Sequence, residues 1–238
     1  MTVQTKALEY SQDDTTFEGY FAWDDAGAEP RPCVLVSHAW GGQGEFEQAR
    51  ARDLAELGYA AFCVDLYGKG VRGASPEENA ALMQPFLDDR AMLQDRLTTA
   101  LDVASQQPGV DASRMAAIGY CFGGLCVLDL ARVGAEVLGV ASFHGIFYPP
   151  GNTEGNEIKA KVLALHGWDD PLAPPEQVVG LAAELTAAGA DWQIHGHGHA
   201  VHAFTKPEAN DPAAGMVYNE AAANRSWQAM RNFLEDLF

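Results

Sequence analysis

The feature that most constrains the fold is a cysteine in a glycine-bounded turn. Residues 119–124 read Gly-Tyr-Cys-Phe-Gly-Gly, directly after the apolar run 115–118 and before the helix-like stretch 125–133. A side chain at the tip of such a strand-to-helix turn is pushed out at the carboxyl end of a sheet, and flanking glycines relieve backbone crowding. The pattern predicts a nucleophile elbow with Cys121 at its tip; a buried cysteine at a closely packed helix start is the structural alternative.

Length and composition bound the class of protein. The chain has 238 residues, of which 47% are hydrophobic and 20% are charged, and this is enough apolar material for a sizeable core. No linker divides it, so we expect a single domain over residues 1–238. The chain shows neither a long apolar run nor a basic segment followed by an apolar core, so we expect a cytoplasmic protein without a membrane span.

The net charge of the chain limits the classes of partner that it can bind. The formal net charge is -18, and only 15 Lys and Arg residues are present, scattered along the sequence. Phosphate backbones and anionic lipids are held by clustered Lys and Arg, so we expect no nucleic-acid or membrane partner. A small-molecule substrate and a monomer or small homo-oligomer are expected instead. Cys33, Cys63 and Cys126 lie in apolar or helical runs, which favours reduced core thiols.

Apolar strand-like runs alternate with helical patterns along most of the chain. This order predicts an α/β fold with a mainly parallel sheet and helices on both faces. Before it, residues 5–10 and 15–23 predict an antiparallel hairpin at the sheet edge. The predicted strands are 33–37, 60–66, 115–120, 137–143, 162–166 and 192–195, and the predicted helices are 45–57, 80–105, 125–133, 176–188 and 219–237.

Candidate partners for the thiol follow later strands. A nucleophilic thiol needs a base, and the base needs an acid that fixes its tautomer and orientation. Asp169 and Asp170 follow the strand 162–166, and His202 follows the next strand. The order nucleophile, acid, histidine is that of α/β-hydrolases. Both aspartates remain candidates from the pattern alone, because adjacent carboxylates cannot both aim at one imidazole; a helix N-cap is the structural alternative for either.

Four motifs carry a resemblance to a known family. They are residues 119–124 (Gly-Tyr-Cys-Phe-Gly-Gly), 57–61 (Leu-Gly-Tyr-Ala-Ala) leading to 65–68 (Asp-Leu-Tyr-Gly), 166–171 (His-Gly-Trp-Asp-Asp-Pro) and 202–207 (His-Ala-Phe-Thr-Lys-Pro). With them the chain resembles the dienelactone hydrolase family over nearly its whole length, which implies an α/β-hydrolase fold. The resemblance implies a cofactor-free hydrolase of esters or lactones, with Cys121 as nucleophile, Asp170 as acid and His202 as base.

The resemblance also implies an oxyanion hole. It points to the backbone N–H groups of Trp40 and Phe122, and the start of the following helix favours negative charge at the same place. His38, Trp40 and Lys206 are the candidate substrate-binding residues. Lys206 matches one basic position with which the family grips a substrate carboxylate.

The sequence departs from the best-known members of the family at two positions. Ala39 stands where those members carry a glutamate that helps control the cysteine, and the second carboxylate-binding cation, an arginine, has no match. Arg72 and Arg90 are possible substitutes for that arginine. These departures leave a thioesterase or a general short-chain carboxylesterase as alternatives, and a redox-sensing or ligand-binding module using Cys121 as the non-enzyme alternative.

Three histidines alternate at positions 195, 197 and 199. A strand there places them on one face, where a metal-binding patch is conceivable. No carboxylate or thiolate cluster with ligand spacing accompanies them, and the resemblance implies no metal, so we expect none.

Overall fold

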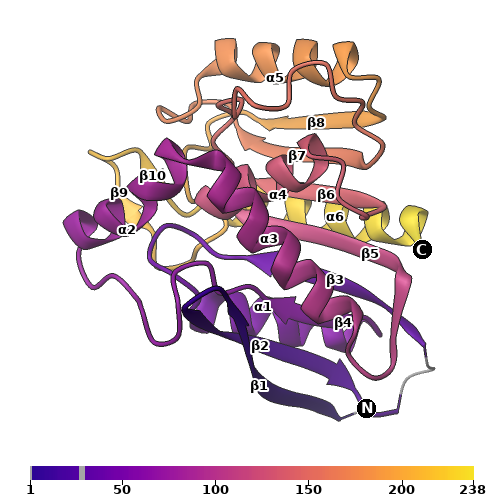
Figure 1. Cartoon of the computed structure of the whole chain (residues 1–238). Helices are drawn as coiled ribbons and strands as arrows, with labels where there is room; N and C mark the ends of the chain where they lie inside the picture. Colours follow the sequence, from indigo (N-terminus) through magenta and orange to yellow (C-terminus); the bar gives the residue numbers. More distant parts are fainter. Residues whose placement is uncertain (1, 27–29) are drawn as a thin grey trace.

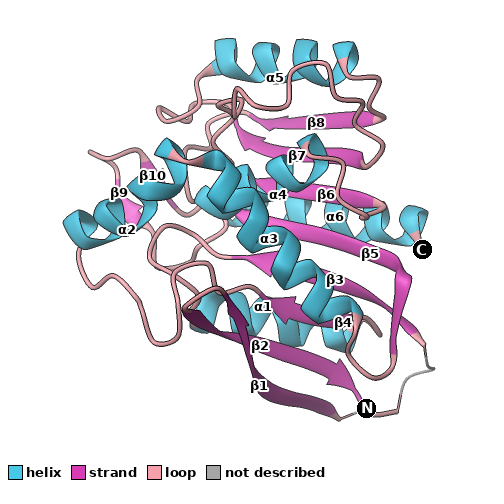
Figure 2. Ribbon diagram, in the orientation of Figure 1, coloured by secondary structure: helices cyan, strands magenta, loops and turns pink. Residues whose placement is uncertain are grey.

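An eight-stranded sheet forms the centre of the computed structural model, which describes residues 2–26 and 30–238 (Figures 1 and 2). The strands lie in the order β1-β2-β4-β3-β5-β6-β7-β8. The pairs β1–β2 and β2–β4 are antiparallel, and all the other pairs are parallel. The predicted mainly parallel sheet with an N-terminal hairpin is thus confirmed. The strands are β1 Val3–Gln12, β2 Thr15–Asp24, β3 Arg31–Ser37, β4 Ala60–Cys63, β5 Val110–Tyr120, β6 Gly139–Phe143, β7 Lys161–Gly167 and β8 Trp192–His197, with the short β9 Asn210–Asp211 and β10 Met216–Val217 forming a separate ribbon.

Helices cover both faces of the sheet. Strand β3 shows why: Cys33 and Leu35 point into the layer with α3, α4 and α5, whereas Val34 and Val36 point into the layer with α1 and α6. Alternate residues of a strand face opposite sides, so a strand buried on both sides is apolar throughout. In Figure 1 α3 crosses in front of the sheet, and α1 and α6 lie behind it. The helices are α1 Glu45–Glu56, α2 Pro76–Asp88, α3 Arg90–Ser105, α4 Phe122–Arg132, α5 Pro175–Ala187 and α6 Glu220–Leu237.

The predicted single helix over residues 80–105 is wrong. The structure has two helices, α2 and α3, which are separated at Asp89 (φ -124, ψ 86). The Asp89 carboxylate accepts a hydrogen bond from the Met92 N–H at 3.0 Å, so it caps the start of α3. Its own N–H closes α2 on the Pro85 carbonyl at 2.9 Å. Asp89, four residues after Pro85, marks the boundary between the two helices in the sequence. The apolar periodicity continues across this boundary and predicts one helix.

Two properties of the chain bear on its environment. No helix within the described residues has the length and apolarity needed to cross a membrane. All four cysteines are free thiols: Cys33, Cys63 and Cys126 are buried, and Cys121 is partly exposed. Cys121 is therefore the thiol that reagents in solvent reach most readily.

The turn between β5 and α4 is packed so tightly that two of its residues must be glycine. A carbon added at Gly119 would lie 2.0 Å from the Gly123 carbonyl oxygen, and one added at Gly123 would lie 2.1 Å from the Ser37 carbonyl oxygen. Each contact is with backbone, which cannot swing aside as a side chain can. The elbow is thus fixed against the end of β3 as well as against its own strand.

We expect the substitution Gly123→Ala to lower the free energy of unfolding by at least about 3 kcal/mol, because its methyl group overlaps the backbone at the end of β3. Urea or thermal unfolding measures the loss. Gly180→Ala is the matched control, since it lies exposed on α5 with no atom within 4 Å of the added carbon. That control should be neutral or stabilising by up to about 1 kcal/mol. Equal stability of the two variants would contradict the close approach.

Candidate active site

Cys121 occupies a strained position at the start of α4. Its backbone has φ 56 and ψ -116, a combination that non-glycine residues rarely adopt. The turn is held by a hydrogen bond from the Cys121 N–H to the Phe143 carbonyl at 3.0 Å and by one from the Gly124 N–H to the Cys121 carbonyl at 2.9 Å. Strand β5 thus delivers the thiol to the carboxyl edge of the sheet, as the sequence predicts for a nucleophile elbow.

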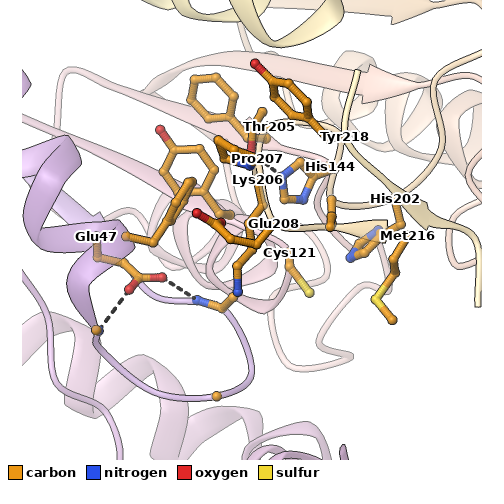
Figure 3. A pocket seen from close by; sticks show the side chains of 18 of the residues that line it. Glu47, Cys121, His144, His202, Thr205, Lys206, Pro207, Glu208, Met216 and Tyr218 are labelled. Atoms are coloured by element: carbon orange, nitrogen blue, oxygen red, sulfur yellow. Dashed lines mark hydrogen bonds between the residues drawn. The ribbon is translucent and has the colours of Figure 1, made fainter. Parts of the chain in front are cut away.

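His202 lies beside this thiol (Figure 3). It is joined to Asp170 on its other side. Its Nδ1 is 2.8 Å from Asp170 Oδ2, and both side chains are buried. The other oxygen of Asp170 accepts the Leu172 N–H at 2.8 Å. His202 Nε2 has no oxygen or nitrogen partner among the described residues, which leaves it open toward Cys121.

The loop that carries His202 is pinned by β10. The His202 N–H donates to the Gly215 carbonyl at 2.9 Å, and its carbonyl accepts from the Val217 N–H at 3.2 Å. These two bonds fix the backbone on both sides of the imidazole. β10 pairs with β9, so the short ribbon that the sequence did not predict holds the histidine in place.

The neighbouring carboxylates point to different partners. Asp169 is half exposed, and its Oδ2 lies 3.7 Å from Nδ1 of the fully exposed His199. The Asp170 side chain, by contrast, has no exposed surface. The geometry therefore places Asp170, and not Asp169, on the imidazole of His202.

Charges and dipoles around Cys121 favour its thiolate. Burial raises the pKa of the thiol, but the charge of His202 and the backbone N–H groups of Phe122 and Trp40 outweigh burial, and the pKa is lowered. Burial in turn lowers the pKa of His202, but the charge of Cys121 and the hydrogen bond to Asp170 outweigh it, and the pKa is raised. Each of the two groups thus favours the charged form of the other, a thiolate at Cys121 and an imidazolium at His202. The same two N–H groups would face the oxygen of a substrate carbonyl attacked by the sulfur.

Cys121 and His202 line a cavity of about 1130 Å³. It lies between the β3–α1 loop (residues 38–44), the first turns of α1 and α6, and the segment after His202 (Figure 3). Trp40 lines it, as do aromatic side chains from several other elements. These are Phe46, Tyr120, Phe143, Tyr218 and Trp227.

The candidate substrate-binding residues fall in different places. Trp40 and the exposed Lys206 line the cavity. His38 is fully buried beneath the loop: its Nδ1 is 2.7 Å from the Ala39 carbonyl, and its Nε2 accepts the Leu66 N–H at 3.3 Å. Burial lowers the pKa of His38 to about 4. His38 thus supports the loop from below and does not form part of the cavity wall.

Neither possible replacement for the missing arginine lies at the cavity. Arg90 is buried in a bidentate pair with Asp129, with nitrogen–oxygen distances of 2.6 and 2.8 Å. Arg72 donates to the carbonyl and side chain of Gln43 on the outer side of the loop. A second cation does line the cavity, Arg50 of α1, but it is paired with Asp53 at 2.8 Å.

The alternating histidines diverge in their contacts. His197 Nε2 is 2.9 Å from Ser226 Oγ, His199 faces Asp169, and His195 is exposed. Within the described residues, no group of three His, Cys, Asp or Glu side chains is arranged to hold a metal ion.

Sequence reasoning missed one buried acid in the cavity wall, Glu47 of α1. Its carboxylate accepts the N–H groups of Ala39 and Gly44 at 3.3 and 2.9 Å. The signal was present in the sequence, because Glu47 shares the buried face of α1 with Ala51 and Leu54 at helical spacing. An acid on the apolar face of a helix indicates a specific partner.

Comparisons with known proteins agree with this architecture. The model of the dienelactone hydrolase family matches residues 17–238. A solved structure described as a dienelactone hydrolase-like promiscuous phosphotriesterase from metagenomic libraries superposes with a TM-score of 0.95 at 37% identity, and the match covers 99% of both chains. These matches confirm the predicted α/β-hydrolase fold.

Curated relatives extend the comparison. The carboxymethylenebutenolidase of Pseudomonas putida is 26% identical over 202 residues, which cover 81% of each protein. An uncharacterized protein of Caenorhabditis elegans is 34% identical over 157 residues, which cover 63% of this chain and 98% of that protein.

The thiolate–imidazolium pair makes a prediction about reactivity. Because the pKa of Cys121 is lowered from the ordinary 9.0, iodoacetamide should still alkylate it rapidly at neutral pH. In His202→Ala the effect of burial is no longer opposed, so the thiol pKa should rise and alkylation at neutral pH should slow by roughly 10-fold or more. A pH–rate profile of both proteins measures this, with His195→Ala as the unaffected control. An unchanged pH–rate profile in His202→Ala would show that His202 does not lower the pKa of Cys121.

The two aspartates make a second prediction. Asp170→Asn removes the acceptor that fixes the tautomer of His202, so kcat on a short aryl ester should fall by about 10³- to 10⁴-fold. Asp169→Asn should change kcat by less than about 2-fold, since an exposed pair contributes little. Initial rates at saturating ester compare them, and a reversed order of the two losses would assign the acid to Asp169.

Proposed function

We propose that this chain, which belongs to the dienelactone hydrolase family and is a carboxylic ester hydrolase, cleaves its substrate through Cys121, His202 and Asp170 by way of an acyl-enzyme. One observation carries the proposal. The lowered pKa of Cys121 arises from His202 and from two backbone N–H groups that converge on the sulfur, while Asp170 holds the far side of the imidazole at 2.8 Å. Cys121, His202 and Trp40 thus line one cavity, and the buried Asp170 and Phe122 support them from behind.

The reaction follows from these positions. The Cys121 thiolate attacks the carbonyl carbon, and the N–H groups of Trp40 and Phe122 stabilise the negative charge that moves onto the oxygen. As the carbon–oxygen bond breaks, the His202 imidazolium gives its proton to the departing alkoxide, and a thioester to Cys121 remains. His202 then takes a proton from water, which attacks the thioester and releases the acid and the thiolate. With a lactone, the alcohol is part of the acyl group, so the second step releases a single hydroxy acid.

The charges at the cavity favour a neutral substrate over an anionic one. The carboxylates of Glu45, Glu47, Glu208 and Asp211 line it. Of the Lys and Arg side chains among its described lining residues, Arg50 is already paired with Asp53, and the charge of Lys206 already acts on the carboxyl of Glu47. A lone, exposed ammonium gives weak selection for an anion among so many carboxylates. We therefore favour uncharged esters and lactones with an aromatic or alkyl group over dienelactones that carry a carboxylate.

A second activity has support from the 37% identical relative, which is described as a promiscuous phosphotriesterase. A phosphotriester is uncharged, so it fits the same argument about charge. Its phosphoryl oxygen gains negative charge on attack and would meet the same two N–H groups as a carbonyl oxygen does. We propose neutral aryl phosphotriesters as secondary substrates of the site.

The proposed function predicts the outcome of a substrate panel. Neutral aryl esters should be hydrolysed with a kcat/KM at least about 10-fold above that for an anionic dienelactone, because one exposed cation cannot offset the surrounding carboxylates. Cys121→Ala should abolish turnover of every ester while leaving the unfolding temperature unchanged. Substantial turnover by folded Cys121→Ala would remove the proposed mechanism.

Lys206→Ala is the control for charge selection. It should raise KM for the anionic lactone by about 3- to 10-fold and leave the neutral ester unaffected. A dienelactone preferred over every neutral ester, and lost in Lys206→Ala, would reverse the proposed substrate class. Acyl thioesters in the same panel decide whether a thioesterase activity exceeds both.

A further inference from the structure

Glu47 makes contacts that a helix cap does not require. It lies in the first turn of α1 and is 4% exposed, although it is ionisable. One carboxylate oxygen accepts the Gly44 N–H at 2.9 Å, next to the helix start. The other reaches back along the chain to the Ala39 N–H at 3.3 Å, as the dashed lines of Figure 3 show. The second bond lies beyond what helix capping needs.

Trp40, whose N–H donates to the sulfur, lies in the sequence between the two residues that Glu47 holds. Trp40 follows Ala39 directly, and its N–H is one of the two that act on Cys121. Other groups hold carbonyls of the loop: the Tyr67 hydroxyl donates to the Trp40 carbonyl at 2.9 Å, and the Gly73 N–H donates to the Gly41 carbonyl at 3.1 Å. The N–H groups at the two ends of the loop are held by Glu47.

The carboxylate has no function in the proton transfers that the proposed mechanism uses. Burial raises the pKa of Glu47, and the Gly44 and Ala39 N–H groups oppose that rise. A buried acid with this balance is retained at a cost in solvation, which specific hydrogen bonds must offset. The two hydrogen bonds from Glu47 to the loop are such bonds, and they can hold the loop in one shape during catalysis.

We propose that Glu47 is a positioning residue, whose two carboxylate oxygens hold residues 39–44 in the shape that keeps the Trp40 N–H aimed at the oxygen of the transition state. The proposal rests on the proposed function of the same site. Without Glu47 the buried Ala39 N–H lacks its acceptor, and the loop relaxes toward water. The thiol, His202 and Asp170 stay in place, so the loss falls on stabilisation of the oxyanion.

The test uses Glu47→Gln and Glu47→Ala in the full chain. Glutamine keeps one accepting oxygen, so it can hold the Gly44 N–H or the Ala39 N–H but not both, because its NH₂ group cannot accept an N–H. Glu56→Gln is the matched control, because it removes the same charge from the exposed end of the same helix. Thermal unfolding verifies that each variant is folded.

Kinetics on a neutral aryl ester give the first measurement. At a pH where the thiolate is fully formed, kcat of Glu47→Gln should fall by about 10- to 100-fold while KM changes by less than about 3-fold. Glu47→Ala should lose at least as much, and Glu56→Gln should match the wild type. Wild-type kcat in a folded Glu47→Gln would overturn the proposal, as would a loss of activity explained by KM alone.

Alkylation of Cys121 by iodoacetamide gives a second measurement that needs no ester turnover. Removing a negative charge by itself makes a nearby thiolate easier to form and lowers the thiol pKa. Losing the Trp40 N–H from the sulfur has the opposite effect, so we expect a higher apparent pKa in both Glu47 variants. An unchanged or lower pKa would overturn the positioning role. Should the wild type hydrolyse no ester, the proposed function would fail, and this pKa would still decide the role of Glu47.

Discussion

The backbone of Cys121 is the constraint on which the site depends. A residue at φ 56 and ψ -116 is held there at a cost of about 1–3 kcal/mol, which the surrounding structure must offset. The structure does so with contacts on every side: Gly123 lies against the end of β3, and the Cys121 N–H bonds to the Phe143 carbonyl at the end of β6. The thiol is therefore positioned by three neighbouring parallel strands at once. Moving any of them would move the sulfur relative to Trp40, which follows β3.

Burial then decides which ionisable groups take part in the chemistry. His144 lies beside His202, with ring centroids 5.2 Å apart. Burial, and to a lesser extent the charge of His202, keep the pKa of His144 well below its ordinary value. Its Nε2 is occupied by the Thr205 hydroxyl at 2.8 Å. His144 is thus held neutral and hydrogen-bonded, which leaves His202 as the imidazole that faces Cys121. Asp170 reinforces this choice because it is reachable from His202 and not from solvent.

The parts of the structure that sequence could predict are those set by local patterns. Apolar runs such as 33–37 predict buried strands, and glycines around Cys121 predict the elbow, since both depend on neighbours in the chain. Side-chain direction at a turn is different: Asp169 and Asp170 are adjacent, and the backbone bend that sends one inward depends on contacts with residues near position 200. His38 was expected at the substrate and lies beneath the loop for the same kind of reason. Long-range support, as from Glu47 to Ala39, leaves a local trace only as an acid on an apolar helix face.

The acidity of the chain and the anionic transition state of ester cleavage are compatible because they act over different distances. The net charge is -18, and few of the charged side chains are buried; at the surface, salt screens charges beyond about 8 Å. The N–H groups of Trp40 and Phe122 act on the sulfur at short range, where salt does not screen them, and dipoles held fixed by the backbone interact strongly. Neutral esters meet no long-range repulsion on approach and acquire negative charge after they reach these two donors. In the proposed mechanism the two N–H groups would thus stabilise the charge that forms during the reaction without cations that would bind an anionic substrate beforehand.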